Sequence, residues 1–383
     1  MKKRNLVTRF AALAMAASMA ASGLTGCQSS TPKETTAAAT EAATETTAEE
    51  TTAAETTAEA EKAAESSDTV TVTDMAGREV TLPAQINSIA TFGSIGVINA
   101  FVELMGYGDK ICNDMTASFT KSDKWAMQYQ FAPQIKGAPV LQNADGEIQM
   151  EEVLALNPDL CLVMSKDLIE PLESNGLNVV YFEWKKTDDV KEAVTLMGEA
   201  LGQQEVAADY LAYFDSMVEE AGEKTKDLTD DTKKTVLYGN IDKLTQPHVI
   251  AEWWIKTAGG ISVTENAWDS EGKNCTYTQE DLLKWNPDVF LTTDKKMKET
   301  LTSESLYSDI PAVKDDAIYC IPTVAHVWGN RTVEQPLTVF WTMHKLYPEL
   351  ETKEDLAEKI SYFYSHFFKC ELSDEQIDTI IAD

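Results

Sequence analysis

The stretch MEEVLALNPDLCLVM at residues 150–164 decides the fold, because QEDLLKWNPDVFLTT at residues 279–293 repeats its pattern. Each copy carries an acidic residue near its start, Glu151 or Glu280, followed by apolar residues at helical spacing. An Asn-Pro-Asp tripeptide and a short apolar run complete each copy. Proline disfavours the helical conformation of the residue before it, so each helix should end there, and the apolar run suits a strand of a buried parallel sheet. Two copies predict two similar α/β lobes, each with its own sheet.

Residues 1–26 have the composition of a secretory leader. A basic start precedes an apolar and small-residue stretch at residues 10–24, which is too short to span a bilayer. The leader ends in Leu-Thr-Gly-Cys at residues 24–27, which resembles a bacterial lipobox, where the chain is cut before a cysteine that then carries lipid, including palmitate. A chance cysteine after an ordinary signal is the alternative. We predict that acylated Cys27 anchors the protein to the extracytoplasmic face of the cell membrane.

Residues 27–68 form a distinct segment built almost wholly of Thr, Ala, Glu and Ser, with no aromatic residue. Such a segment cannot bury enough apolar surface to offset its ordering entropy, so it is predicted to be a disordered, acidic tether with a reach of roughly 35 Å. The net charge of −31 argues against nucleic acid as a partner. The five cysteines after Cys27 form no Cys-x-x-Cys pair, and no disulfide framework is expected.

The remaining chain divides into an N-terminal α/β lobe at residues 69–187, a connecting helix at 188–228, and a C-terminal α/β lobe with terminal helices at 229–383. Alternating residues around Gly77 predict a hairpin at the start of the first lobe. A strand at 86–92 leads into Gly93-Ser94, where the exposed amides of a helix start would attract an anionic ligand. A simple helix cap is the alternative role for Ser94. The apolar spacing across 188–228 predicts a rigid connector, with Gly202 as a possible interruption.

Taken together, these features resemble the cluster III substrate-binding proteins of ABC importers. The resemblance covers residues 70 to about 350, and its most specific parts are the hairpin with Asp74, Gly77 and Arg78, the paired Pro-Asp units, and Trp-Gly-Asn-Arg at residues 328–331. It implies two Rossmann-like lobes joined by a single long helix, with the ligand in a cleft between the lobes. It also implies a monomer that delivers its ligand to permease and ATPase subunits. Ligands of this family include ferric siderophores, haem, cobalamin and, in one branch, molybdate.

The resemblance also implies roles for two acidic residues. In this family each lobe presents one Glu, at the start of a helix, to arginines of the permease. Counting seven residues back from Pro158 and Pro287 gives Glu151 and Glu280. The alternative is that carboxylates are favoured at helix starts in any protein. One departure from the family is Gly-Asn-Arg at residues 329–331, where Ser-Pro-Arg is usual.

Arg331 is the main candidate for ligand binding on the evidence of the residues themselves. After Cys27 the chain contains only two arginines, Arg78 and Arg331, against many lysines. A guanidinium next to Trp328 suits a carboxylate, catecholate or oxyanion, although a salt bridge that holds the loop is the alternative. Arg78, in a turn, is interpreted as structural. The other candidate ligand contacts are Trp328, His326, Tyr238, Trp254, Trp184 and Ser94.

The predicted function is capture of a metal complex, a ferric siderophore in the first instance, for iron transport across the membrane. Cobalamin, haem or a molybdate-type oxyanion on the same fold is the alternative. No cofactor and no bare metal site are predicted, because only four histidines occur and none lies between residues 69 and 228. An enzyme is not expected, since the chain has no Gly-x-Ser-x-Gly, His-Glu-x-x-His or phosphate-loop motif. A surface adhesin is a weaker third reading.

Overall fold

The computed structural model describes residues 68–93, 95–143, 145–184 and 186–382. The predicted leader, the tether, Cys27 and Ser94 lie outside these residues, so the predictions for them stay predictions. No helix within the described ranges has the length and apolar character needed to cross a bilayer.

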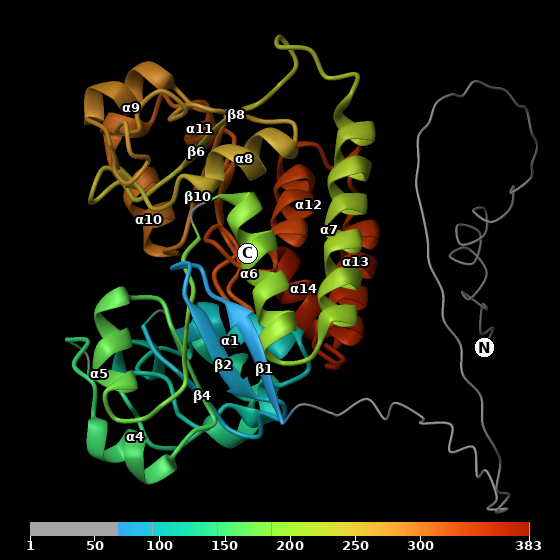
Figure 1. Cartoon of the computed structure of the whole chain (residues 1–383). Helices are drawn as coiled ribbons and strands as arrows, with labels where there is room; N and C mark the ends of the chain where they lie inside the picture. The colour runs from blue at the N-terminus through green and yellow to red at the C-terminus, as the bar shows by residue number, and fades with distance from the viewer. Residues whose placement is uncertain (1–67, 94, 144, 185, 383) are drawn as a thin grey trace, which may run out of the picture. The chain divides into compact units, whose positions relative to one another are not determined.

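The first lobe contains a parallel sheet of three strands in the order β3-β4-β5, beside an antiparallel hairpin (Figure 1). The sheet strands are β3 (Ile89–Thr91), β4 (Leu160–Val163) and β5 (Val179–Tyr181), and the hairpin strands are β1 (Thr69–Thr73) and β2 (Glu79–Pro83). The helices of this lobe are α1 (Ile95–Leu104), α2 (Ala117–Thr120), α3 (Gln128–Phe131), α4 (Met150–Leu156) and α5 (Ile169–Glu173). In the hairpin turn, Arg78 forms ion pairs with Asp74 and Glu173, each at 2.6 Å, which gives it a structural role.

The second lobe contains a parallel sheet of four strands in the order β11-β10-β6-β8 and a short antiparallel pair. The sheet strands are β6 (Thr235–Tyr238), β8 (Ile261–Ser262), β10 (Val289–Thr292) and β11 (Ile318–Cys320), and the pair is β7 (Thr245–Gln246) with β9 (Cys275–Thr276). Its helices are α8 (Ile250–Thr257), α9 (Gln279–Trp285), α10 (Lys296–Ser303), α11 (Pro311–Lys314) and α12 (Gln335–Leu346). The prediction of two α/β lobes is therefore confirmed.

The repeated unit has the same local structure in both lobes. Helices α4 and α9 end at Asn157 and Asn286, whose φ angles of 46° and 49° are left-handed, a conformation that asparagine tolerates. The aspartate of each unit then binds the neighbouring strand, because Asp159 accepts the amide of Asn87 at 2.8 Å and Asp288 accepts the amide of Thr235 at 2.8 Å. The following strands, β4 and β10, are fully buried and lie inside their sheets.

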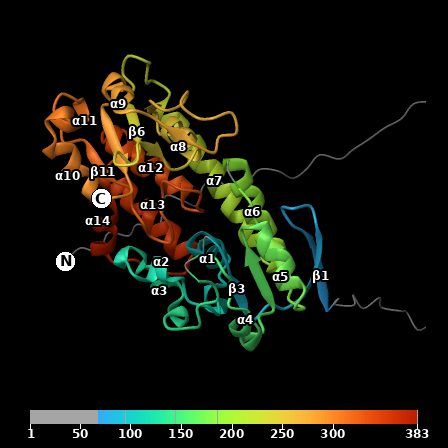
Figure 2. The same cartoon turned by 90° about the vertical axis from the view of Figure 1, so that its left-hand side faces the viewer.

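The connector between the lobes is a pair of antiparallel helices, α6 (Thr187–Ala200) and α7 (Gln204–Thr225), which corrects the expectation of one helix across residues 188–228 (Figure 2). The chain turns at Gly202, whose φ of 67° is unfavourable for a residue with a side chain. Lys191 of α6 forms an ion pair with Asp215 of α7, so the helices run side by side. Helix α6 packs on β1 and α1 of the first lobe, and α7 packs on α8 and α12 of the second.

The terminal helices α13 (Lys353–His366) and α14 (Asp374–Ala382) pack against each other, and α13 also packs against α12 (Figure 1). Aromatic contacts extend from α13 to the first lobe, where the Tyr364 ring stacks on Phe131 at 5.6 Å. Just after α13, Phe367 meets Tyr210 of α7 at 5.6 Å. The C-terminal segment therefore contacts the first lobe, the connector and the second lobe together.

Candidate functional site

The segments that follow the parallel strands of the two lobes meet each other. Ligands of open α/β sheets bind beyond the carboxyl ends of the strands, so this region is the first place to look for a site. Lys124 of the first lobe donates to the carbonyl of Thr293, which follows β10, at 3.1 Å. Arg331, beyond β11, donates to the carbonyl of Trp184, beyond β5, at 2.6 Å. The two lobes therefore enclose a common region at these ends.

A cavity of about 240 Å³ lies beside Arg331, lined by residues of the second lobe, and we call it the basic pocket. Its lining residues are Pro247, His248, Val249, Trp268, Gly272, Lys273 and Arg331. Three of these residues carry basic groups, and none of them carries a carboxylate. A cavity walled in this way favours a negatively charged occupant.

Two histidines, the half-buried His248 and the buried His326, lie close to this positive charge. Burial and, to a lesser extent, the charge of Arg331 together lower the pKa of His248 to about 4. Burial lowers the pKa of His326 to about 3, with His248, Lys124 and Arg331 contributing to the same shift. Both imidazoles are therefore neutral at pH 7. An anion placed among these groups would oppose the repulsion that depresses both pKa values.

His326 faces the first lobe. Its ring centre lies 5.2 Å from that of Trp125, and its Nδ1 atom has no hydrogen-bond partner among the described residues. This atom lies 3.3 Å from the position that a Cβ atom on Gly96 would occupy, in the first turn of α1. A side chain at residue 96 would press on the imidazole. The ring nitrogen without a partner keeps His326 a candidate for contact with a ligand.

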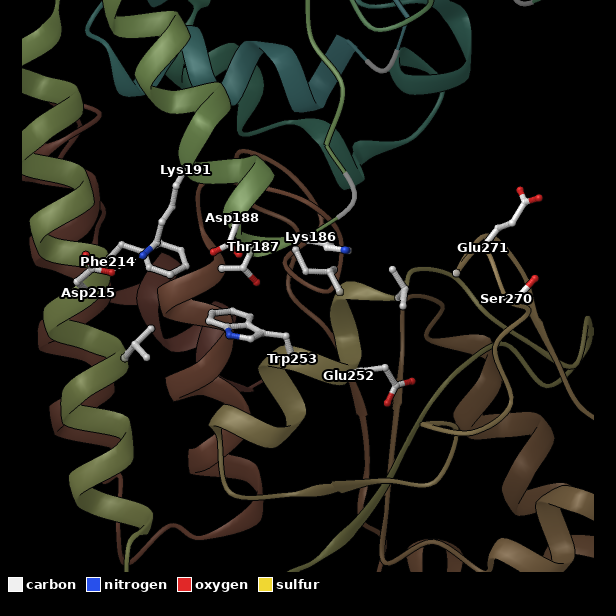
Figure 3. Close-up of a pocket in the computed structure, with 14 residues that line it drawn as sticks. Lys186, Thr187, Asp188, Lys191, Phe214, Asp215, Glu252, Trp253, Ser270 and Glu271 are labelled. Atoms are coloured by element: carbon white, nitrogen blue, oxygen red, sulfur yellow. Dashed lines mark hydrogen bonds and ion pairs between the residues drawn. The ribbon is translucent and has the colours of Figure 1, made fainter. Parts of the chain in front are cut away.

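A larger cavity of about 600 Å³, the hinge pocket, lies between the connector and α8 (Figure 3). It shares Val249 and Gly272 with the basic pocket, so the two cavities adjoin. The rings of Trp253 and Phe214 stack on its wall at 5.6 Å, as Figure 3 shows beside the start of α6. Lys191 lies 4.9 Å from the centre of the Phe214 ring. The combined site offers an anion-binding end and an aromatic end, in a volume typical of small-molecule pockets.

Four aromatic residues that were expected to contact the ligand are instead fully buried around the loop that carries Arg331. Each directs its ring N–H or hydroxyl group to this loop: Trp328 to Glu334 (2.8 Å), Tyr238 to the Asn330 side chain (3.3 Å), Trp254 to the Gly329 carbonyl (3.4 Å) and Trp184 to the Arg331 carbonyl (3.2 Å). Their polar groups are thus engaged with protein, and their direct contact with a ligand stays a prediction. They support the loop and thereby position Arg331.

Glu334 fixes the other end of this loop from a fully buried position. Its carboxylate accepts the amides of Ala325 (2.9 Å) and His326 (2.8 Å), the hydroxyl of Thr332 (2.9 Å), the ring N–H of Trp328 and the hydroxyl of Tyr364. Burial raises the pKa of Glu334, and these donors oppose that rise. Such a set of donors compensates the cost of burying the charge and orders His326 in the process.

Glu103 of α1 is a second buried carboxyl group, and it lies on the opposite side of the contact between lobes. Burial raises the pKa of Glu103 well above its usual range, and the charge of Glu334 raises it further. Gln128 links the two sides, since its amide nitrogen donates to the Ala325 carbonyl and lies 3.5 Å from the Glu103 carboxyl group. Glu103 is therefore expected to be protonated at neutral pH.

Replacing Glu103 by Gln is expected to raise the free energy of unfolding increasingly as the pH rises. A carboxyl group whose folded pKa is raised stabilises the protein fully below its unfolded pKa of 4.5, and this contribution is lost as the pH rises through the folded pKa. Glutamine keeps the shape without titrating, so its advantage should grow by at most about 1.4 kcal/mol for each pH unit. Thermal unfolding from pH 5 to pH 9 measures this, with the exposed Glu354→Gln variant as the control. A difference that does not change with pH would contradict it.

The predicted docking residues Glu151 and Glu280 are exposed in the first turns of α4 and α9. Sequence reasoning did not select His248, Lys124 or Lys273 as site residues. One signal was available for Lys124, which lies in an aromatic-rich segment without clear periodicity. Across the described ranges, no three His, Cys, Asp or Glu side chains are arranged to hold a metal ion.

Comparison with known proteins identifies a matching family and several relatives. The family described as "Periplasmic binding protein" matches residues 112–325. The uncharacterized ABC transporter substrate-binding lipoprotein YvrC of Bacillus subtilis is 22% identical over 276 residues, which cover 69% of this chain and 82% of YvrC. The iron(3+)-hydroxamate-binding protein YxeB of the same organism is 23% identical over 193 residues, which cover 45% of this chain and 58% of YxeB.

Solved structures show the same fold. A periplasmic solute binding protein of Veillonella parvula superposes with a TM-score of 0.69 and 22% identity, over 82% of this chain and 96% of that protein. The molybdate-binding protein MolA of Haemophilus influenzae, solved with molybdate, superposes with a TM-score of 0.66 and 18% identity, over 79% of this chain and 99% of MolA.

Proposed function

The chain belongs to the periplasmic binding protein family, in the cluster III group of substrate-binding components of ABC transporters, and we propose that it captures an anionic metal chelate, a ferric siderophore, between its lobes. The observation that carries this proposal is the pairing of the basic pocket, with Arg331 and His248, and the adjoining hinge pocket with its Trp253–Phe214 stack. An anionic donor group would occupy the basic pocket, and the organic part of the chelate would lie on the aromatic rings.

A bare metal cation fits the basic pocket poorly, because Arg331 and Lys273 would repel it, although the adjoining hinge pocket is also lined by the carboxylates of Asp188, Asp215, Glu252 and Glu271. A metal enclosed in an anionic chelate would be attracted instead, because the negatively charged oxygens of the chelate face the guanidinium. The name of YxeB, an iron(3+)-hydroxamate-binding protein, supports a ligand of this class. Binding proteins of this kind deliver their ligand and do not transform it, so no enzymatic activity is proposed.

An oxyanion of the molybdate type is the second candidate. The basic pocket, at about 240 Å³, is large enough for a small oxyanion without the hinge pocket. The similarity to MolA, which is 28% identical over 93 residues and was solved with molybdate, supports this candidate. Under this alternative the aromatic wall of the hinge pocket would stay empty when the ligand binds.

Tryptophan fluorescence separates the two candidates. The mature protein would be titrated with ferric hydroxamate, ferric catecholate and ferric citrate complexes, haem, cobalamin and molybdate. We expect a ferric siderophore to quench the emission, and we expect Trp268→Phe and Trp253→Phe each to remove part of that quenching, since they line different pockets. Binding of molybdate alone, with no effect of Trp253→Phe, would establish the second candidate. No binding by any member of the panel would overturn both.

Membrane attachment through Cys27 belongs to the same proposal. The word "lipoprotein" in the name of YvrC supports it, as does the Leu-Thr-Gly-Cys sequence that ends the leader. Mass spectrometry of membrane-extracted protein is expected to show a lipid-modified peptide that begins at Cys27. An unmodified thiol at this position, with the protein released into the medium, would contradict the anchor. We propose that the anchored protein acts as a monomer with permease and ATPase subunits.

A further inference from the structure

Few large apolar side chains are exposed in the described part of the chain, and two of them occupy the same position of the repeat. The exposed large hydrophobic residues are Leu154 (43%), Leu283 (38%), Leu306 (45%) and Tyr362 (48%). Leu154 lies three residues after Glu151, and Leu283 lies three residues after Glu280. Residues three apart on a helix are neighbours on its surface. Each lobe therefore presents one leucine next to one carboxylate.

These leucines do not occupy the fully buried positions of their helices. The buried face of α4 is supplied by Val153 and that of α9 by Leu282, both fully buried. Single exposed leucines are common on protein surfaces and require no explanation. The recurrence at equivalent positions of two helices, each time beside an acidic residue, does require one. A partner that presents the same surface twice would explain it.

The chemistry of the pair defines that partner. A carboxylate pairs with a basic side chain of the partner. A leucine next to the carboxylate packs on an apolar surface beside that basic side chain. An apolar neighbour that excludes water also strengthens an ion pair, because the local dielectric constant falls. A permease built from two equivalent halves offers such a surface twice. A nucleic acid or an anionic lipid surface is disfavoured by the net charge of −31.

We propose that Leu154 and Leu283 are the apolar halves of two matched docking points on the permease, of which Glu151 and Glu280 are the charged halves. This inference rests on the proposed function as the binding component of an importer. It adds that docking depends on buried apolar surface as well as on charge, and that the two lobes contribute equivalently.

The test measures binding of the ligand-loaded protein to the purified permease–ATPase complex of the same importer in nanodiscs, over a series of salt concentrations. Full burial of a leucine is worth about 1.5–3 kcal/mol, but only about two-fifths of Leu154 and Leu283 is exposed (43% and 38%), so each contributes roughly three- to sevenfold in affinity. Leu154→Ser and Leu283→Ser are each expected to weaken docking by roughly threefold or more, and the double variant by more than either. This loss should persist at high salt, whereas loss from charge variants should shrink. Ligand affinity and the melting temperature should be unchanged.

Leu306→Ser is the matched control, because Leu306 is equally exposed and has no counterpart among the exposed apolar residues of the first lobe. We expect it to dock like the wild type. If it weakens docking as much as the repeat variants, the loss reflects general apolar adhesion, and the inference is wrong. If Glu151→Lys and Glu280→Lys abolish docking while the leucine variants do not, the inference is overturned and the proposed function stands. If none of these variants affects docking, the proposed role of this surface fails as well.

Discussion

Replacing both Glu151 and Glu280 by Lys is expected to abolish ligand uptake while leaving ligand affinity in solution unchanged. Both carboxylates are exposed in the first turns of equivalent helices. Among the described residues, neither side chain takes part in a hydrogen bond or ion pair that the structure records. Their neighbour Asp281 differs, since it completes a capping box with Thr278. The two glutamates therefore have no evident structural role. Reversal of their charge would place lysines against the basic side chains that are expected on the permease.

Glu152→Lys is the control for this experiment. It makes the same charge change in the first turn of α4, next to Glu151, but consecutive residues of a helix face different directions. We expect Glu152→Lys to support uptake close to the wild-type level. Uptake by whole cells and titration of the purified variants with the ligand found by fluorescence give the two measurements. A fall in ligand affinity, or in melting temperature, in the Glu151→Lys, Glu280→Lys variant would assign these residues to the pocket or to folding.

The repeat allowed the fold to be predicted because its signals are local. Helical spacing, the proline and the apolar run each act within a few residues, and the structure places helix, left-handed Asn157 or Asn286, and buried strand in that order. The connector could not be predicted in the same way. Gly202 marks a possible break in the helix. The residues on both sides of it are helical in a continuous helix and also in a pair of helices that folds back, so the local sequence does not distinguish the two. That choice depends on contacts such as Lys191 with Asp215, between residues distant in sequence.

The site was predictable where a single residue type carried the signal. The rarity of arginine singled out Arg331, which lines the basic pocket. The four aromatic candidates show a limit of prediction, because a sequence does not show which side of a loop an aromatic ring packs on. Trp328 is two residues from His326, yet its ring is buried against Glu334, whereas His326 keeps a nitrogen with no hydrogen-bond partner in the described part of the chain. His248 and Lys124 belong to different lobes, so only the folded chain brings them near His326.

Arg331 has two possible functions in the structure, and its variants can separate them. One of its nitrogens donates to the Trp184 carbonyl, which holds the loop against the first lobe. The remaining N–H groups are available to a ligand in the basic pocket that Arg331 lines. Burial lowers the pKa of Arg331, and the charge of Glu183 opposes this shift. The guanidinium stays charged in proteins, so an anionic ligand would find a permanent positive charge there.

Arg331→Ala is therefore expected to weaken binding of the proposed ferric siderophore by roughly tenfold to a hundredfold. A charge-assisted bidentate contact is worth about 1.5–3 kcal/mol, and about 1.4 kcal/mol corresponds to one decade in affinity. Arg331→Lys should recover only part of the loss, because an ammonium group cannot reproduce the planar fork. Arg78→Ala is the matched control: it removes the other arginine of the folded chain, together with the ion pairs to Asp74 and Glu173, and should lower the melting temperature without changing affinity. Calorimetric titration and a melting curve of each variant give the answer. Unchanged affinity in Arg331→Ala, or a loss of affinity that only accompanies loss of the fold, would assign Arg331 to the loop alone.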